Sequence, residues 1–310
     1  MQAVTLEKPD TQPTLREDVP EPTPAADEVL VRVHASSVNP VDNSIAAGML
    51  AQMGVEYDYP VILGRDYAGV VEQAGAAVTG YRPGDQVFGF VLHANPTVRD
   101  GAWAELITVT EQLSIAPAPA GVDLATAGVA PLAGITAVTL VDALELSEGD
   151  VLLVAGATGG VGSLAVQLAA RAGARILAPA LAEDEAFLPE LGVSDVLPRD
   201  GEIAELVRDR HPDGVDALLD LVNYAPGTYD AALKPGARVA SSTGAAGEGP
   251  GRTNVMATPS PENLQRLGAL LADGTLRIPV QATYELARAT EALAALPAQH
   301  TQGKLAIQVR

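Results

Sequence analysis

The sequence has 310 residues, 47% of them hydrophobic, with 19 basic and 39 acidic side chains and a formal net charge of −20. This length suggests about two domains, and the hydrophobic fraction is sufficient for packed cores. The lack of cysteine excludes disulfides, a thiol nucleophile and zinc sites built on thiolates. The negative charge, without any run of Lys or Arg, argues against binding to nucleic acid.

We expect no secretory signal at the start of the given sequence. Residues 1–6 alternate like a strand, whereas a secretory signal has a basic start followed by an apolar stretch. The longest uncharged stretch, residues 151–170, contains a glycine cluster in its middle and indicates a strand, a turn and a helix instead of a membrane span. We therefore expect a cytoplasmic protein without a membrane segment.

Up to about residue 120 the chain has short runs of β-branched residues separated by Pro, Gly and Asp. Residues 28–34, 68–73 and 104–109 alternate between apolar and polar positions, which is typical of half-buried strands. Strands this short and frequent predict a barrel-like or sandwich domain.

From residue 123 the pattern changes to helices and buried strands. Residues 123–144 have helical spacing. Apolar strands are predicted at 151–155, 175–178, 217–221 and 237–241, with helices at 161–172, 184–191, 203–210 and 229–233 between them. Such alternation predicts a parallel sheet covered on both faces. A helix at 262–273 and an alternating strand at 304–309 follow. We thus predict one domain over 1–123, a nucleotide-binding domain over 124–258, and a return to the first domain over 259–310.

The most informative stretch is residues 151–162, which read VLLVAGATGGVG. A buried strand leads into a glycine-rich turn, and a helix follows at once. Unpaired N–H groups at such a helix start, together with the helix dipole, form an anion site suited to a pyrophosphate. Gly159 would allow close approach of the ligand, and Gly162 would allow the helix to lie close to the strand. The alternative is a tight turn without a ligand.

Several segments, in chain order, resemble the medium-chain dehydrogenase/reductase superfamily. They are residues 37–42 (SVNPVD), 63–71 (LGRDYAGVV), 83–89 (PGDQVFG), 132–137 (LAGITA), 156–178 and 302–305 (QGKL). Within the superfamily the chain is most similar to the zinc-free quinone oxidoreductases, which reduce quinones or activated C=C bonds with NADPH. The resemblance implies an α/β fold, with a Rossmann-type doubly wound parallel sheet and a GroES-like, mainly β catalytic domain.

The sequence also indicates whether the zinc ligands of this superfamily are present. Zinc-dependent members of this superfamily take ligands from an early Cys, a Gly-His-Glu motif and a later Cys. Here Gly64-Arg65-Asp66 stands at the Gly-His-Glu position, and no cysteine is present. We expect no metal, because the ligands of a Lewis-acidic zinc ion are missing. Hydride transfer to an acceptor that is already electrophilic remains, and quinones and enones fit this description.

Asn39 and Asp42 are the candidate catalytic residues. A zinc-free reductase must orient the acceptor and stabilise the oxyanion that develops as hydride arrives. Asn39 matches the asparagine of the family's Asn-Pro-x-Asp segment and is the first candidate for this contact; the alternative is a turn starter. Asp42 either acts in the site or caps a helix over residues 43–48.

The chain departs from the family pattern nearby. Many quinone reductases of the family have tyrosines where this sequence has Ser44 and Leu50. A phenolic donor is therefore missing at those positions, and Tyr57 and Tyr59 are the aromatic residues on the following loop. No general acid is assigned.

The resemblance also places a nicotinamide cofactor. The predicted contacts are Thr136, Gly156, Ala157, Thr158, Gly159, Gly160, Val161, Arg199, Asn223, Thr243, Gly244 and Lys304. Asn223 and Thr243 follow predicted strands, and doubly wound sheets bind ligands at the C-terminal strand ends. Thr136 is expected at a helix start beside the nicotinamide, or else as a plain N-cap. Lys304 matches the terminal Gly-Lys that reaches over the cofactor cleft in the family.

The choice between NADPH and NAD(H) depends on the end of the second strand of the nucleotide domain. An NAD-binding protein needs a carboxylate there to accept bonds from the ribose hydroxyls, but residues 178–180 are Ala-Pro-Ala. Arg199 follows the third predicted strand, where relatives place Tyr or Arg near the 2′-phosphate; the alternative is a solvated loop arginine. We predict NADPH, mainly from the resemblance, over NAD(H).

The sequence thus predicts an NADPH-dependent, zinc-independent reductase of quinones or α,β-unsaturated carbonyls. The expected partner is a small-molecule substrate, without nucleic acid or membrane, and the resemblance suggests a homodimer. Two alternatives remain open: a dedicated biosynthetic enoyl or ketone reductase, and a nucleotide-binding relative without turnover.

Overall fold

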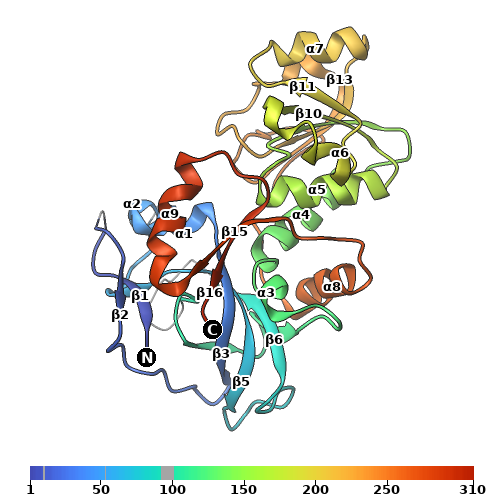
Figure 1. Cartoon of the computed structure of the whole chain (residues 1–310). Helices are drawn as coiled ribbons and strands as arrows, with labels where there is room; N and C mark the ends of the chain where they lie inside the picture. Colours follow the sequence, from blue (N-terminus) through green and yellow to red (C-terminus); the bar gives the residue numbers. More distant parts are fainter. Residues whose placement is uncertain (10, 53, 92–100) are drawn as a thin grey trace. The chain divides into compact units, whose positions relative to one another are not determined.

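The computed structural model describes residues 1–9, 11–52, 54–91 and 101–310. The chain packs into two units (Figure 1). Unit 1 comprises Met1–Leu132, Thr258–Gly274 and Val280–Arg310, and unit 2 comprises Ala133–Ala257 and Thr275–Pro279. The domain boundaries inferred from the sequence, at residues 123 and 258, remain a proposal.

Unit 1 is mainly β. Its 7-stranded sheet has the order β15-β16-β3-β5-β6-β8, with β7 also paired to β3. These strands are β3 (Glu28–Val38), β5 (Asp66–Ala74), β6 (Gln86–Phe90), β7 (Leu106–Thr110), β8 (Ala116–Pro117), β15 (Val280–Glu285) and β16 (Lys304–Gln308). A 3-stranded sheet has the order β2-β1-β4. Its strands are β1 (Ala3–Leu6), β2 (Thr14–Arg16) and β4 (Val61–Ile62).

The alternation in β3 explains how this unit forms its core. Val29, Val31 and Val33 are fully buried, as the two-residue period of a strand requires. The C-terminal strand β16 runs antiparallel to β3, so that the red end of the chain lies beside a blue strand in Figure 1. The helices of unit 1 are α1 (Pro40–Ala46), α2 (Met49–Gln52), α3 (Leu124–Ala127), α8 (Pro261–Ala272), α9 (Ala289–Ala298) and the 3₁₀ turn η3 (Leu286–Arg288).

Unit 2 contains a 6-stranded parallel sheet with the order β11-β10-β9-β12-β13-β14. Its strands are β9 (Val151–Ala155), β10 (Arg175–Ala180), β11 (Asp195–Pro198), β12 (Val215–Asp220), β13 (Leu233–Ser241) and β14 (Arg252–Asn254). Counted along the chain, this is the order 3-2-1-4-5-6 of a doubly wound Rossmann sheet. The predicted α/β fold, with a Rossmann-type parallel sheet in one unit and a mainly β second unit, is therefore confirmed.

The helices of unit 2 correct several predicted bounds. They are α5 (Gly160–Arg171), α6 (Phe187–Leu191), α7 (Ile203–Arg210) and the 3₁₀ turns η1 (Ala182–Asp184) and η2 (Asp230–Ala232). The helix predicted over 184–191 is thus two short pieces, because the Asp184 carboxylate accepts the Leu181 N–H and closes a separate turn. The helix predicted over 229–233 is only the η2 turn, because Leu233 already belongs to β13.

The helical stretch predicted over 123–144 also divides in two. After α3 the chain turns at Gly128, where a Cβ would lie 2.6 Å from the Ala35 carbonyl oxygen. A new helix, α4 (Pro131–Ala143), then starts at a proline, the residue that suits the first turn of a helix. Among the residues that the structure describes, no helix is both long enough and apolar enough to cross a membrane.

Candidate functional site

The glycine turn of unit 2 has the geometry that a dinucleotide pyrophosphate requires. Gly156 follows the last residue of β9 and has φ of +89°, a conformation that L side chains rarely adopt. A Cβ on Gly162 would overlap the Gly156 carbonyl oxygen and lie 2.8 Å from the Ala157 Cα. Helix α5 can therefore approach the strand only with glycine at this position.

Gly159 leaves space above the same turn. It is the N-cap of α5, and the nearest atom to a Cβ there would be the Gly156 oxygen at 3.7 Å. The N-cap of α5 thus carries no side chain, and the first N–H groups of a helix suit an anion. The residues of this turn, Gly156 to Val161, fit a nicotinamide dinucleotide.

Two further predicted cofactor residues lie in one hydrogen-bond network beside this turn. The Asp220 carboxylate, at the end of β12, accepts bonds from the Asn223 N–H at 3.0 Å and from Asn223 Nδ2 at 2.8 Å. The Thr243 hydroxyl donates to the Asn223 carbonyl oxygen, and the Thr243 N–H donates to Ser241 Oγ at 3.1 Å. Gly244 follows with φ of +92°.

The order of the strands places this network beside the glycine turn. Strands β9 and β12 are neighbours, and Ala155 pairs with Asp220 at their carboxyl ends. The direction of strand order reverses between them, which is where doubly wound sheets bind ligands. Asp220 and Ser241 were not among the predicted site residues. Each is the polar last residue of an otherwise apolar strand end, and this feature of the sequence could have identified them.

Arg199 lies at the carboxyl ends of the next two strands. Its N–H donates to the Ala180 carbonyl oxygen at 3.0 Å, and Pro198 pairs with Ala180 across β11 and β10. The Arg199 side chain is exposed and makes no ion pair with a described residue. Its guanidinium is therefore available for a ligand on this part of the sheet edge.

Thr136 lies in the second turn of α4 and is 6% exposed. The alternative that it is a plain N-cap is wrong, because the helix begins five residues earlier, at Pro131. A contact between Thr136 and the nicotinamide remains a prediction.

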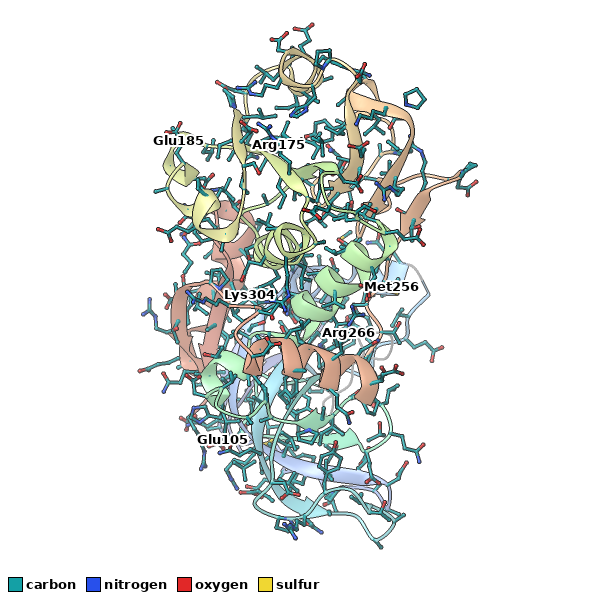
Figure 2. All side chains as sticks on the ribbon, turned by 90° about the vertical axis from the view of Figure 1, so that its right-hand side faces the viewer. Glu105, Arg175, Glu185, Met256, Arg266 and Lys304 are labelled. Atoms are coloured by element: carbon teal, nitrogen blue, oxygen red, sulfur yellow. The ribbon has the colours of Figure 1, made fainter. Side chains whose placement is uncertain are left out.

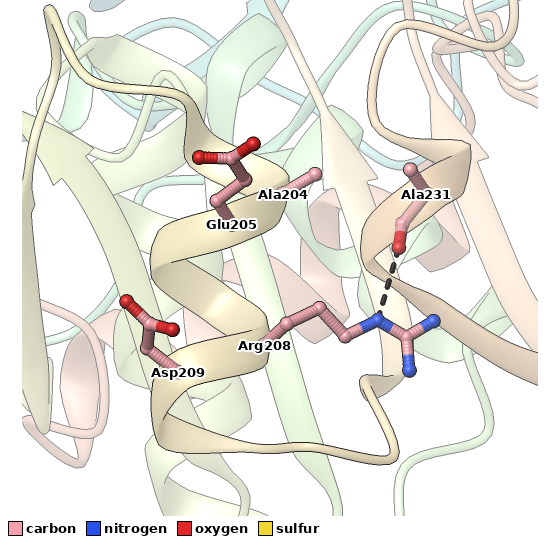
Figure 3. A pocket seen from close by; sticks show the side chains of 5 residues that line it. All are labelled: Ala204, Glu205, Arg208, Asp209 and Ala231. Carbon is pink, nitrogen blue, oxygen red and sulfur yellow. Dashed lines mark hydrogen bonds between the residues drawn. The ribbon is translucent and has the colours of Figure 1, made fainter.

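A surface groove in unit 2 does not belong to this site. It has a volume of about 340 Å³ and is lined by α7 and η2 (Figure 3). Arg208 crosses it and donates to the carbonyl oxygens of Ala231, Pro212 and Leu233. Leu233 starts β13, so the groove lies at the amino ends of the strands, opposite the glycine turn.

Unit 1 contains a buried polar cluster around Asp66, the first residue of β5. One carboxylate oxygen, Oδ2, accepts bonds from Ser37 Oγ at 2.6 Å and Asn39 Nδ2 at 2.8 Å, and lies 3.5 Å from Lys304 Nζ. The other oxygen, Oδ1, accepts the Leu132 N–H at 2.6 Å. We call Ser37, Asn39, Asp66, Leu132 and Lys304 the Asp66 cluster.

Asn39 is held on every side in this cluster. Its Oδ1 accepts a bond from Lys304 Nζ at 2.6 Å, and its Nδ2 donates to Asp66 and, at 3.3 Å, to Ser37 Oγ. It is only 4% exposed. To donate to a substrate oxyanion, Asn39 would have to release one of these acceptors.

Lys304, labelled in Figure 2, is also 4% exposed. Its ammonium group contacts Asn39, Asp66 and the Val38 carbonyl oxygen. Burial lowers the pKa of Lys304, while the neighbouring carboxylates of Asp66 and Asp42 oppose this change. Its predicted contact with the cofactor remains a prediction.

Asp42 is fully buried and accepts two backbone bonds, from Asn39 N at 2.8 Å and Gly64 N at 3.1 Å. Burial raises its pKa to about 6, although the Arg65 guanidinium and both N–H donors favour the charged form. Helix α1 starts at Pro40, before the predicted start at residue 43, so Asp42 lies in its first turn. This geometry favours the capping role over direct contact with a substrate.

Tyr57 and Tyr59 pack against each other, with ring centroids 5.3 Å apart. Both pack against the apolar core of unit 1 that contains Trp103 and Leu63. Burial, followed by the neighbouring Tyr59, raises the pKa of Tyr57 to about 12. A phenol with this pKa stays protonated at neutral pH.

A zinc ion does not fit the side chains at the position of the family's Gly-His-Glu motif. The Arg65 guanidinium is fully buried there and donates to the Ile62 carbonyl oxygen at 2.8 Å. The carboxylates of Asp42 and Asp66 already accept N–H and ammonium donors. Within the described parts of the chain, no three His, Cys, Asp or Glu side chains gather as metal ligands.

Comparisons with known proteins agree with this architecture. The profile of the family "Alcohol dehydrogenase GroES-like domain" matches residues 25–120, and that of the family "Zinc-binding dehydrogenase" matches residues 191–307. A chloroplast envelope quinone oxidoreductase homolog of Arabidopsis thaliana is 29% identical over 94% of this chain and 92% of its own. An NADPH-dependent alkenal/one oxidoreductase from the same plant is 29% identical over 91% of this chain and 72% of its own.

Solved structures show the same fold. The quinone oxidoreductase from Coxiella burnetii superposes with a TM-score of 0.89 and 27% identity, over 100% of this chain and 99% of its own. The GroES-like match lies within unit 1, in agreement with the predicted GroES-like domain, and the dehydrogenase match runs from the second half of unit 2 into the C-terminal segments of unit 1. The chain therefore belongs to the medium-chain dehydrogenase/reductase superfamily of oxidoreductases, in which its relatives include quinone oxidoreductases.

Proposed function

We propose that the protein is an NADPH-dependent, zinc-independent reductase that transfers hydride to a quinone or an α,β-unsaturated carbonyl. The observation that carries the proposal is the glycine turn of unit 2, at the point where the strand order reverses. The backbone is tightly packed around Gly162, whereas there is free space beside Gly159. The names of the relatives support the acceptor class, since they include quinone oxidoreductases and an alkenal/one oxidoreductase.

NADPH, when bound, supplies the hydride. The N–H groups at the start of α5 would hold its pyrophosphate, since Gly159 has no side chain to block the approach. Asn223 and Thr243, which are fixed by Asp220 and Ser241, line the carboxyl ends of the adjacent strands. The acceptor needs no Lewis acid, because its carbonyl already withdraws electron density from the carbon that receives hydride.

An acceptor panel tests this function. We expect the purified protein to oxidise NADPH with at least one quinone or enone, at a rate that EDTA leaves unchanged. Loss of turnover after chelation, restored by added zinc, would show that the reaction depends on a metal. Turnover on a single biosynthetic enoyl or ketone substrate, with simple quinones inert, would instead identify a dedicated biosynthetic reductase.

We further propose that Arg199 reads the 2′-phosphate of NADPH. Its exposed guanidinium lies at the carboxyl end of β11, beside the end of β10, and arginine binds phosphate in a bidentate manner. We expect Arg199→Ala to weaken NADPH binding by about tenfold, the equivalent of a charge-assisted bond of roughly 1.5 kcal/mol, and to leave NADH binding unchanged. Fluorescence titration with both cofactors measures the ratio.

Arg171 provides the matched control for this experiment, because it is an exposed arginine in the last turn of α5. Arg171→Ala should change neither affinity. Equal weakening of NADPH and NADH in Arg199→Ala would contradict a role in reading the 2′-phosphate.

A second candidate is a nucleotide-binding relative without turnover. It is favoured by Asn39, whose two amide N–H bonds are both directed at buried acceptors. Tight NADPH binding with no turnover on any quinone or enone would support this alternative. The homodimer and the cytoplasmic location inferred from the sequence remain proposals.

A further inference from the structure

We propose that Asp66 is a positioning residue of the reductase, which sets the direction of the Asn39 amide and of the first turn of α4. The inference rests on the proposed function for its catalytic consequence. The five residues of the Asp66 cluster all belong to unit 1. Asp66 itself is fully buried, so it acts through the residues that it binds.

The donors to Asp66 come from four separate places in the chain. Ser37 belongs to β3, Asn39 precedes α1, Leu132 is in the first turn of α4 and Lys304 starts β16. These residues are separated from Asp66 by 29, 27, 66 and 238 positions along the sequence. A single carboxylate therefore joins four elements of the fold.

The electrostatics of the Asp66 cluster permit only one orientation of the Asn39 amide. In the observed orientation its oxygen accepts from the Lys304 ammonium, and its nitrogen donates to the Asp66 carboxylate. The reversed amide would place its N–H₂ group against an ammonium and its oxygen against a carboxylate. Both contacts would be repulsive, and burial strengthens the repulsion because the local dielectric is low.

The backbone of Asn39 is fixed independently. The Asp42 carboxylate accepts the Asn39 N–H, so removal of the Asp66 charge frees the side chain but leaves the backbone held. The effect of Asp66 on Asn39 can therefore be separated from general unfolding of the loop.

The change to make is Asp66→Asn, which keeps the size of the side chain but removes its charge. In the proposed reaction Asn39 releases its longer bond, to Ser37 Oγ at 3.3 Å, and donates that N–H to the acceptor, while its 2.8 Å bond to Asp66 keeps the amide oriented. Without that carboxylate we expect kcat to fall by up to about 100-fold, the scale associated with a misplacement of about 1 Å. The affinity for NADPH should stay within about twofold, because the glycine turn lies in the other unit. Steady-state kinetics and fluorescence titration give the two quantities.

A double-mutant cycle with Asn39→Ala distinguishes positioning from a general structural effect. If Asp66 acts through Asn39, the double variant should have nearly the same kcat as Asn39→Ala alone. Multiplicative losses in the double variant would overturn the proposal. Asp216→Asn is the matched control, since Asp216 binds Lys234 and the Val151 N–H near the amino ends of strands of unit 2, and it should leave kcat unchanged.

Hydrogen exchange of the Asn39 side-chain amide tests the same role without requiring turnover. The side-chain NH₂ of Asn39 should exchange slowly with solvent in the wild type, and at least tenfold faster in Asp66→Asn. If Asp66→Asn does not fold, Asp66→Asn combined with Lys304→Met removes both charges of the pair, and comparison of its exchange rate with that of Lys304→Met alone isolates the contribution of Asp66. Unchanged exchange would refute the positioning role.

The failure of the two proposals can be told apart. Absence of turnover in the wild type on every acceptor would refute the proposed function, while the exchange experiment would still decide the orientation of Asn39. Unchanged kcat and exchange in Asp66→Asn, with an active wild type, would refute only the positioning role.

Discussion

Substituting Gly162 by alanine is expected to destabilise unit 2 and to abolish NADPH binding. The added methyl group would overlap the Gly156 carbonyl oxygen and lie 2.8 Å from the Ala157 Cα, and both atoms belong to the backbone. Backbone cannot move aside as a flexible side chain can, so α5 must shift away from β9. We expect a cost of about 3 kcal/mol or more in the free energy of unfolding, at the upper end of overpacking effects. Denaturant unfolding and NADPH titration measure the two losses.

Gly159→Ala is the matched control within the same turn. Its φ of −71° suits any L residue, and the added Cβ meets only the Gly156 oxygen, at 3.7 Å. The free energy of unfolding should therefore change by less than about 1 kcal/mol. NADPH affinity should nevertheless fall at least tenfold, because the methyl group would occupy the open space at the N-cap of α5 where the pyrophosphate is proposed to bind.

The two variants together test the turn as a pyrophosphate site. A Gly159→Ala protein that binds NADPH like the wild type would show that the cofactor does not approach this backbone. A Gly162→Ala protein of normal stability would contradict the close packing of α5 on β9.

The stability of the protein relative to its Asp42→Asn variant should decrease as pH rises from about 4 to above 6. Burial raises the pKa of Asp42 from 3.8 to about 6, so between these values the folded protein binds a proton that the unfolded chain has released. The unfolding free energy contributed by this group is therefore fully present below pH 3.8 and is lost as pH rises through 6. This difference in pKa between the folded and unfolded protein corresponds to roughly 3 kcal/mol.

Urea unfolding of both proteins at a series of pH values checks this, since the other titrating groups cancel in the difference. Asp18→Asn gives a control of opposite sign, because its hydrogen bond with Arg16 lowers the pKa of the exposed Asp18. The Asp18 contribution should grow as pH rises through the acid range. A constant difference between wild type and Asp42→Asn would contradict the raised pKa.

Much of unit 2 could be predicted from the sequence because its signals are local. The apolar run of β9, the glycine turn and the apolar spacing of α5 lie within about twenty consecutive residues, and the structure has all three. Helix starts were predicted less well. Helix α1 begins at Pro40, before the expected start at residue 43, and α4 begins at Pro131, inside the single helical stretch expected over 123–144. In both cases the first helical residue is a proline, which suits that position but is not apolar-periodic with the residues that follow.

The proximity of some predicted site residues follows from the predicted sheet, whereas the contact between others does not. Asn223 and Thr243 lie in one network because each follows a strand of one parallel sheet, a relation that strand order alone determines. Asn39 and Lys304 were predicted for different tasks, yet they form a hydrogen bond of 2.6 Å across 265 positions of sequence. The pattern of apolar and polar residues around Asn39 or around Lys304 does not indicate that the two side chains are in contact.

The sequence by itself determined the fold class, the glycine turn and the lack of thiolate ligands, because these depend on residue type and on spacing within one or two elements. Only the tertiary structure decided that Asp66 joins Ser37, Asn39, Leu132 and Lys304, and that the Asn39 amide is directed inward. The physical reason is that buried charges take their partners from whichever elements the sheet brings together. Such partners are specified by the pairing of β16 with β3 and of β3 with β5, and by no local pattern.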